Sequence, residues 1–91
     1  MPDFFTLLAF YYACDQGAID GTLRAEQVLR CADAYRQVKT RFLTQDELDS
    51  LSTLDHAGRS AHLRNGYLRF KIWEDTNPAL VDSLRRQAEA A

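Results

Sequence analysis

The sequence predicts an all-α fold, a compact bundle of four to five short helices within a single small domain over residues 1–91. Three observations lead to this prediction. Apolar residues recur every three or four positions along most of the chain, as on one face of a helix. Residues that favour helix ends stand at most of the expected boundaries. The 91 residues include only two prolines and four glycines, so few positions interrupt a helix.

The first helix is expected over residues 3–15, with Pro2 and Asp3 at its start. Its core-facing side has the i, i+3, i+4, i+7 spacing and comprises Phe4, Leu7, Leu8, Tyr11 and Cys14. Gly17 is the expected stop, because glycine commonly follows the last helical residue. Residues 17–21 are therefore expected to form a turn.

This first helix carries more aromatic side chains than one core-facing stripe needs. The residues outside the stripe are Phe5, Phe10 and Tyr12. A helix that is apolar on most of its circumference lies centrally in its own domain or is covered by another chain. A small domain has few elements to surround such a helix. We therefore expect these three residues to bind a partner, and at least one of them to be exposed in the monomer.

The second helix is expected over roughly 23–41, with Asp20 or Thr22 as its cap. Its side facing the core is expected to comprise Val28, Cys31, Ala32, Tyr35, Val38 and Phe42.

The third helix has the clearest local start signal in the chain. Thr44 and Glu47 have the spacing of a capping box, and Leu43 and Leu48 have that of a hydrophobic staple. The expected inner side comprises Leu48, Leu51 and Leu54. Gly58 is the expected exit from this helix.

Residues 59–74 fit two structures. As a helix, they place Leu63, Tyr67, Phe70 and Trp73 on one side, although Gly66 costs about 1 kcal/mol relative to alanine. As a hairpin over 59–73, they would turn at Asn65-Gly66, a preferred two-residue turn. The helix is favoured because the stretch has few β-branched residues, and the alternative is an α+β fold with this small hairpin.

The last helix is expected from Pro78 to about residue 89. Thr76 and Asn77 read as its cap, and proline is favoured at the first helical position. Its apolar side comprises Leu80, Val81, Leu84 and Ala88.

Composition and charge exclude several function classes. The net charge of −2 excludes a chain that binds nucleic acid through overall positive charge. The apolar run from Phe4 to Cys14 is far shorter than the roughly twenty residues needed to span a bilayer, and Asp3 stands where a signal peptide is basic. The two cysteines, at apolar positions, are expected to be free and buried. We therefore expect a cytoplasmic protein that does not contact membranes.

The chain carries no recognisable catalytic, cofactor or metal motif. His56 and His62 are six positions apart and far from the cysteines, so no zinc-ligand spacing occurs. No glycine-rich phosphate loop is present. We expect no cofactor and no metal, and we expect that the protein is not an enzyme.

The remaining function classes involve binding. The sequence favours a non-enzymatic protein–protein interaction module, such as an adaptor, an inhibitor or a regulatory subunit, with a protein partner or a second copy of the chain. A second candidate patch comprises Arg64, Arg69 and Trp73, residue types that often dominate interfaces. The alternative is a small nucleic-acid-binding regulator that uses residues 56–73, where basic residues alternate with aromatic ones.

Overall fold

A computed structural model describes residues 3–90, with side chains described to residue 89. These residues form five helices and no strand, namely α1 (Phe4–Asp20), α2 (Ala25–Thr40), α3 (Gln45–Ser50), α4 (His56–Thr76) and α5 (Pro78–Ala90). The all-α prediction is confirmed, and the alternative with a hairpin at 59–73 is wrong.

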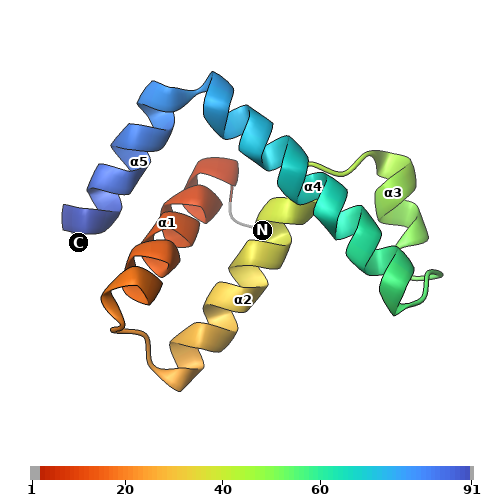
Figure 1. Ribbon diagram of the computed structural model, residues 1–91, viewed down its shortest axis with the longest axis horizontal. Coiled ribbons are helices and arrows are strands. Elements are labelled where there is room, and N and C mark those ends of the chain that lie inside the picture. Colours follow the sequence, from red (N-terminus) through yellow and green to blue (C-terminus); the bar gives the residue numbers. More distant parts are fainter. Residues whose placement is uncertain (1–2, 91) are drawn as a thin grey trace.

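The helices form a flat arrangement, with extents of 41 × 33 × 22 Å. α1 lies between α2 and α5, and α1 and α2 run antiparallel (Figure 1). α4 crosses the C-terminal end of α2 and leads into α5, whereas α3 lies at the outer end of α4 (Figure 1). An α-helix is about 10–12 Å across, so the molecule is only about two helices thick. Much of the surface of α1 is therefore left uncovered by other helices.

α1 is longer than predicted. It begins after Asp3, whose carboxylate accepts a hydrogen bond from the Thr6 N–H at 2.7 Å. The predicted stop at Gly17 is wrong, because the helix continues to Asp20 and ends at Gly21. Gly21 has φ 68°, the left-handed conformation that glycine adopts without steric cost. Gly17 costs the helix only about 1 kcal/mol, which packing against α2 and α5 offsets.

The start of α2 also differs from the prediction. Neither Asp20 nor Thr22 caps it, since Asp20 still belongs to α1 and Ala25 is the first helical residue of α2. Instead, the Gln27 side chain accepts a hydrogen bond from the Arg24 N–H at 2.8 Å.

The face that α2 buries is rotated from the predicted one. Its buried residues are Cys31, Ala34 and Val38, whereas Val28 and Ala32 are exposed. Ala34 was not expected in the core. It belongs to the core cluster that also contains Leu7, Leu8 and Val38.

The capping box of α3 is confirmed. The Thr44 hydroxyl accepts a hydrogen bond from the Glu47 N–H at 3.2 Å, and Glu47 Oε1 accepts one from the Thr44 N–H at 2.8 Å. The exit at Gly58 is wrong, because α3 ends at Ser50. Gly58 lies in the first turn of α4, where its N–H donates to the Asp55 carboxylate at 2.8 Å.

α4 runs without interruption through Gly66, the residue that made a hairpin plausible. Gly66 is buried where α4 crosses α2. A Cβ atom at this position would overlap the main-chain carbonyl oxygen of Lys39. Glycine is therefore required for the close crossing of two helices rather than for a turn.

The core forms where α1, α2, α4 and α5 meet. Its largest fully buried side chains are Tyr12, Phe70, Leu8 and Val38, and α5 adds Val81 and Leu84. Phe70 also joins an aromatic cluster with Phe4, Phe42 and Trp73. This cluster fixes the start of α1 against α4.

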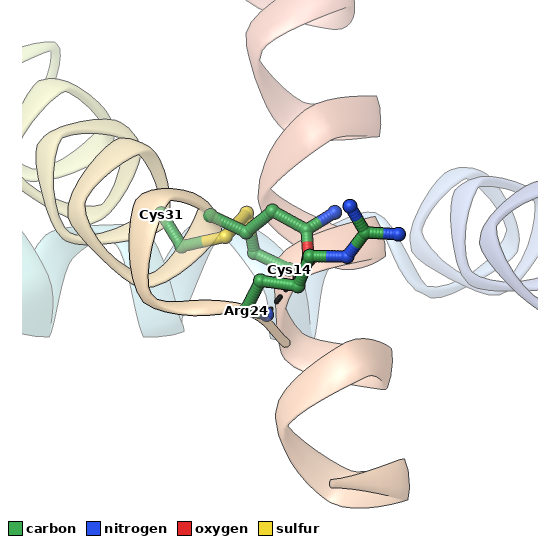
Figure 2. The surroundings of a disulfide bond; sticks show 4 residues. Cys14, Arg24 and Cys31 are labelled. Carbon is green, nitrogen blue, oxygen red and sulfur yellow. Dashed lines mark hydrogen bonds between the residues drawn. A yellow bond between two sulfur atoms is a disulfide. The ribbon is translucent and has the colours of Figure 1, made fainter. Parts of the chain in front are cut away.

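The two cysteines form a disulfide, so the expectation of free thiols is wrong. Cys14 of α1 and Cys31 of α2 are both buried, with Cα atoms 5.6 Å apart (Figure 2). The antiparallel pairing of α1 and α2 places these residues opposite each other at a distance that suits a disulfide. Among the described helices, none is both long enough and apolar enough to span a membrane.

Candidate interaction surface

The three aromatic residues of α1 that were expected to bind a partner do not form one patch. Phe5 is 55% exposed and Phe10 is 44% exposed, whereas Tyr12 is only 2% exposed. The prediction that at least one of them is exposed is therefore confirmed. Five residues of α-helix turn the chain by about 140° beyond a full circle, so Phe5 and Phe10 face different directions.

Tyr12 is a core residue, and its assignment as a partner-binding residue needs correction. Its ring is buried, and its hydroxyl donates a hydrogen bond to Glu74 Oε2 at 2.5 Å. Burial and this hydrogen bond both raise the pKa of the Tyr12 phenol. A side chain held in this way is not available to another chain.

Phe10 lies beside an open groove between α1 and α2. The groove has a volume of about 590 Å³, and Leu7 and Ala34 are among its apolar lining residues. Leu29 lines the same groove and is 75% exposed. A smaller hollow of about 170 Å³ shares Phe10 and Arg30 with the groove and extends it to the disulfide. We call this surface the α1–α2 groove.

Leu29 was missed by the sequence analysis. Its position is off the predicted core-facing stripe of α2, and its neighbour Arg30 is polar. A large aliphatic residue on the outer side of an amphipathic helix is the only signal that could have found it. The position of Leu29 next to Phe10 follows from how α2 packs on α1.

The charged residues at the groove differ in whether their side chains have partners among the described residues. The Asp33 carboxylate accepts hydrogen bonds from Arg36 at 2.7 Å and from Gln37 at 2.6 Å. These hydrogen bonds, that of Arg36 first, hold the pKa of Asp33 below its ordinary value. Arg30, by contrast, makes no ion pair or hydrogen bond through its side chain within residues 3–90. The groove therefore offers one free positive charge.

The second candidate patch is not assembled on one surface. Arg69 donates to the Phe42 carbonyl at 2.9 Å and pairs with Glu47 at 2.6 Å, which attaches α3 to α4. Trp73 is half-buried and packs against Phe4 with ring centres 5.3 Å apart. Arg64 is exposed. Arg69 and Trp73 thus hold the fold together, and Arg64 alone of the three is free for a partner.

Contacts within the protein also occupy most of the basic residues of segment 56–73. Arg59 donates to the Leu54 carbonyl at 2.6 Å, and Lys71 pairs with Glu74 at 2.6 Å. Arg69 is engaged as described above. Few cations of this segment are left for phosphate groups, so the arrangement favours nucleic-acid binding less than the sequence pattern does.

Glu74 is a buried acid that the sequence analysis did not single out. It is 7% exposed and contacts Tyr12, Lys71 and, at 3.6 Å, Arg85. The hydrogen bond to Glu74 raises the pKa of the Lys71 ammonium. Glu74 follows Phe70 by one helical turn, and an acidic residue at a core-facing position is the signal that could have found it. Its partners come from α1, α4 and α5, so it acts as a buried tie between three helices.

One serine and one histidine lie close together. Ser50 Oγ lies 3.1 Å from His62 Nε2, and the same hydroxyl donates a hydrogen bond to the Glu47 carbonyl at 3.0 Å. The contact between Ser50 and His62 links the end of α3 to α4. No group of three potential metal ligands occurs among the described residues.

No protein-family model, no curated protein and no solved structure matches this chain.

Proposed function

We propose that this chain is a non-enzymatic protein–protein interaction module, as an adaptor, an inhibitor or a regulatory subunit, and that it binds its partner in the α1–α2 groove. The observation that carries the proposal is the juxtaposition of Phe10 and Leu29, two exposed apolar side chains from different helices, over one groove. Exposed apolar side chains that gather over a groove usually mark an interaction site.

The flat shape of the molecule explains why such a surface exists. α1 is flanked by α2 and α5, but its side at Phe10 has no helix over it. Covering Phe10 and Leu29 would remove apolar surface from water at a gain of about 25 cal/mol per Å². A partner chain would cover these side chains, because a chain of this size has too few helices to cover them itself.

The groove fits an amphipathic helix better than a flat surface. Two antiparallel helices form its walls, and a third helix can lay its apolar side between them. Arg30, the free cation of the groove, favours a partner helix with a carboxylate at its edge. A second copy of this chain is the other source of such a helix.

The cytoplasmic location expected from the sequence also remains a proposal. The Cys14–Cys31 disulfide weighs against it, because disulfides persist mainly in oxidising compartments.

A co-purification experiment with matched variants tests the proposed function. Tagged wild-type chain, Phe10→Ser and Ile72→Ser are purified from the native host. Ile72 is 63% exposed on α4, does not line the groove and serves as the control for loss of an exposed apolar side chain. We expect a protein in stoichiometric amount with wild type and Ile72→Ser, but not with Phe10→Ser.

Three other outcomes are informative. Identical protein sets with all three chains would contradict the proposal. Recovery of the untagged chain itself as the only stoichiometric protein, with loss in Phe10→Ser, would identify self-association through the groove. Nucleic acid that copurifies with all three chains and is released by salt would support the alternative function instead.

A further inference from the structure

A second concave site lies beside α1, separated from the α1–α2 groove by the buried side chains of Leu7 and Cys14. It is a pocket of about 350 Å³ between α1, α2 and α4. Val38 and Phe70, both buried, form its apolar floor. This volume lies in the range of pockets that hold small molecules.

Three tyrosines form the walls of this pocket. Tyr11 comes from α1, Tyr35 from α2 and Tyr67 from α4. The rings of Tyr11 and Tyr35 meet edge to face with centres 5.1 Å apart, and Tyr11 meets Phe70 in the same way at 5.3 Å. Tyr11 and Tyr35 thus offer electron-rich aromatic rings, which attract cations. The Tyr67 ring already has the ammonium groups of Lys39 and Lys71 at 6.0 Å from its centre.

Asp15 adds a negative charge to the aromatic walls. It follows Tyr11 by one turn of α1 and lines the same pocket. Its carboxylate lies close enough to both Tyr11 and Tyr35 to contribute, after burial, to raising the pKa of each phenol, that of Tyr11 to about 12. Both tyrosines therefore stay neutral hydrogen-bond donors at physiological pH.

Four polar side chains of the pocket have no hydrogen-bond or ion-pair partner among the described residues. Within residues 3–90, the side chains of Tyr11, Asp15, Tyr35 and Lys39 make no hydrogen bond and no ion pair. The acidic groups elsewhere that are most shielded, Glu47 and Glu74, both have cationic partners. The Asp15 carboxylate lies beside aromatic rings and makes no ion pair within residues 3–90. A cationic ligand would supply the missing partner.

Lys39 defines the opposite end of the pocket. It follows Tyr35 by one turn of α2, and its Nζ lies 6.0 Å from the centre of the Tyr67 ring. The pocket therefore has a negative end at Asp15 and a positive end at Lys39, with an apolar floor between them.

We propose that this pocket binds a small organic ammonium compound, with the ammonium group against Asp15 between the Tyr11 and Tyr35 rings. The apolar body of the ligand lies on Val38 and Phe70. Lys39 selects against a second positive charge at the far end, so monoamines bind and diamines of similar length are rejected. This site does not depend on the α1–α2 groove or on its partner.

The test compares two ligands that differ in charge at one atom. Phenethylammonium is titrated into the isotope-labelled wild-type chain and followed by amide chemical shifts, with neutral 2-phenylethanol as the matched probe. We expect shifts at the amides of residues 11, 15, 35 and 39, and an affinity for the alcohol that is weaker by about tenfold or more, corresponding to 1.4 kcal/mol.

Two variants assign this preference to Asp15. Asp15→Asn should remove the preference for the amine, whereas Asp46→Asn, which removes the same charge on α3, should keep it. Because Asp15 makes no hydrogen bond and no ion pair within residues 3–90, Asp15→Asn should keep the melting temperature of wild type, which circular dichroism checks. Equal affinity for both ligands, binding of neither at millimolar concentration, or an unchanged preference in folded Asp15→Asn would overturn the proposal.

Discussion

Tyr12 of α1 donates a hydrogen bond to Glu74 of α4 at 2.5 Å, although the two residues are 62 positions apart in the sequence. The acceptor carboxylate is buried and also meets Lys71 and Arg85. A buried charge is tolerated only when such partners replace the water that it loses. The bond therefore ties α1 to α4 at the centre of the molecule.

Replacement of the Tyr12 hydroxyl should destabilise the protein. Tyr12→Phe keeps the ring but leaves Glu74 with one donor fewer, at a cost of roughly 1–3 kcal/mol in the free energy of unfolding. Chemical denaturation measures this loss. Tyr67→Phe is the control, because the Tyr67 hydroxyl makes no hydrogen bond within residues 3–90. Equal losses in both variants would show that the bond to Glu74 contributes nothing.

The cap of α3 should make a measurable contribution. Thr44→Ala removes the acceptor of the Glu47 N–H and should lower the free energy of unfolding by about 1 kcal/mol. Thr22→Ala serves as the control, since Thr22 is exposed and caps no helix. A loss in Thr22→Ala as large as that in Thr44→Ala would argue against the capping role.

The ion pair between Glu47 and Arg69 should make the stability of the folded protein depend on pH in the acidic range. Hydrogen bonds from Arg69 and then from the Thr44 main chain lower the pKa of Glu47 from 4.5 to about 2. A carboxyl group with a lowered pKa in the folded state stabilises the protein above pH 4.5, and this contribution disappears as the pH falls towards 2.

Glu47→Gln isolates this charge, because glutamine can still accept the capping hydrogen bond from Thr44. The variant should melt below wild type at pH 7, and the two melting temperatures should converge near pH 2. Asp46→Asn, at a neighbouring exposed position, should give the smaller difference at pH 7. A gap between Glu47→Gln and wild type that stays constant over this range would contradict the assignment.

The crossing of α2 and α4 should not tolerate a side chain at position 66. Gly66→Ala places a methyl group on the Lys39 carbonyl, and the helices must separate at a cost of about 1–3 kcal/mol despite the better helix propensity of alanine. Gly17→Ala is the matched control, because its methyl group would overlap the side chain of Leu23, which can move, and would meet no main-chain atom that closely. We expect thermal melts to show a loss for Gly66→Ala and no loss for Gly17→Ala.

The disulfide should stabilise the folded chain. Cys14 and Cys31 are 17 positions apart, and closing a loop of about this length contributes roughly 3 kcal/mol. Dithiothreitol should lower the melting temperature of wild type but not that of the double variant Cys14→Ser/Cys31→Ser. Protein taken from its host into a thiol-blocking reagent should remain unlabelled, and two labelled cysteines would show that the bond is absent there.

The sequence by itself determined the features that depend on neighbours within one helical turn. The all-α class follows from apolar spacing, the start of α3 from Thr44 and Glu47, and the start of α5 from Pro78. The cap of α3 joins residues three positions apart, and proline favours the first position of α5 through its own fixed φ, so the deciding residues are neighbours in the printed sequence.

Only the tertiary structure decided the features that depend on distant residues. Gly66 lies within a helix because α2 crosses it, Tyr12 is in the core because Glu74 meets it, and the cysteines are joined because α1 and α2 pair. The same packing brings Leu29 beside Phe10 and Asp15 beside Tyr35. Helical periodicity tells which residues share one side of a helix, but not which other helix covers that side, because the choice rests on the combined packing of all five helices.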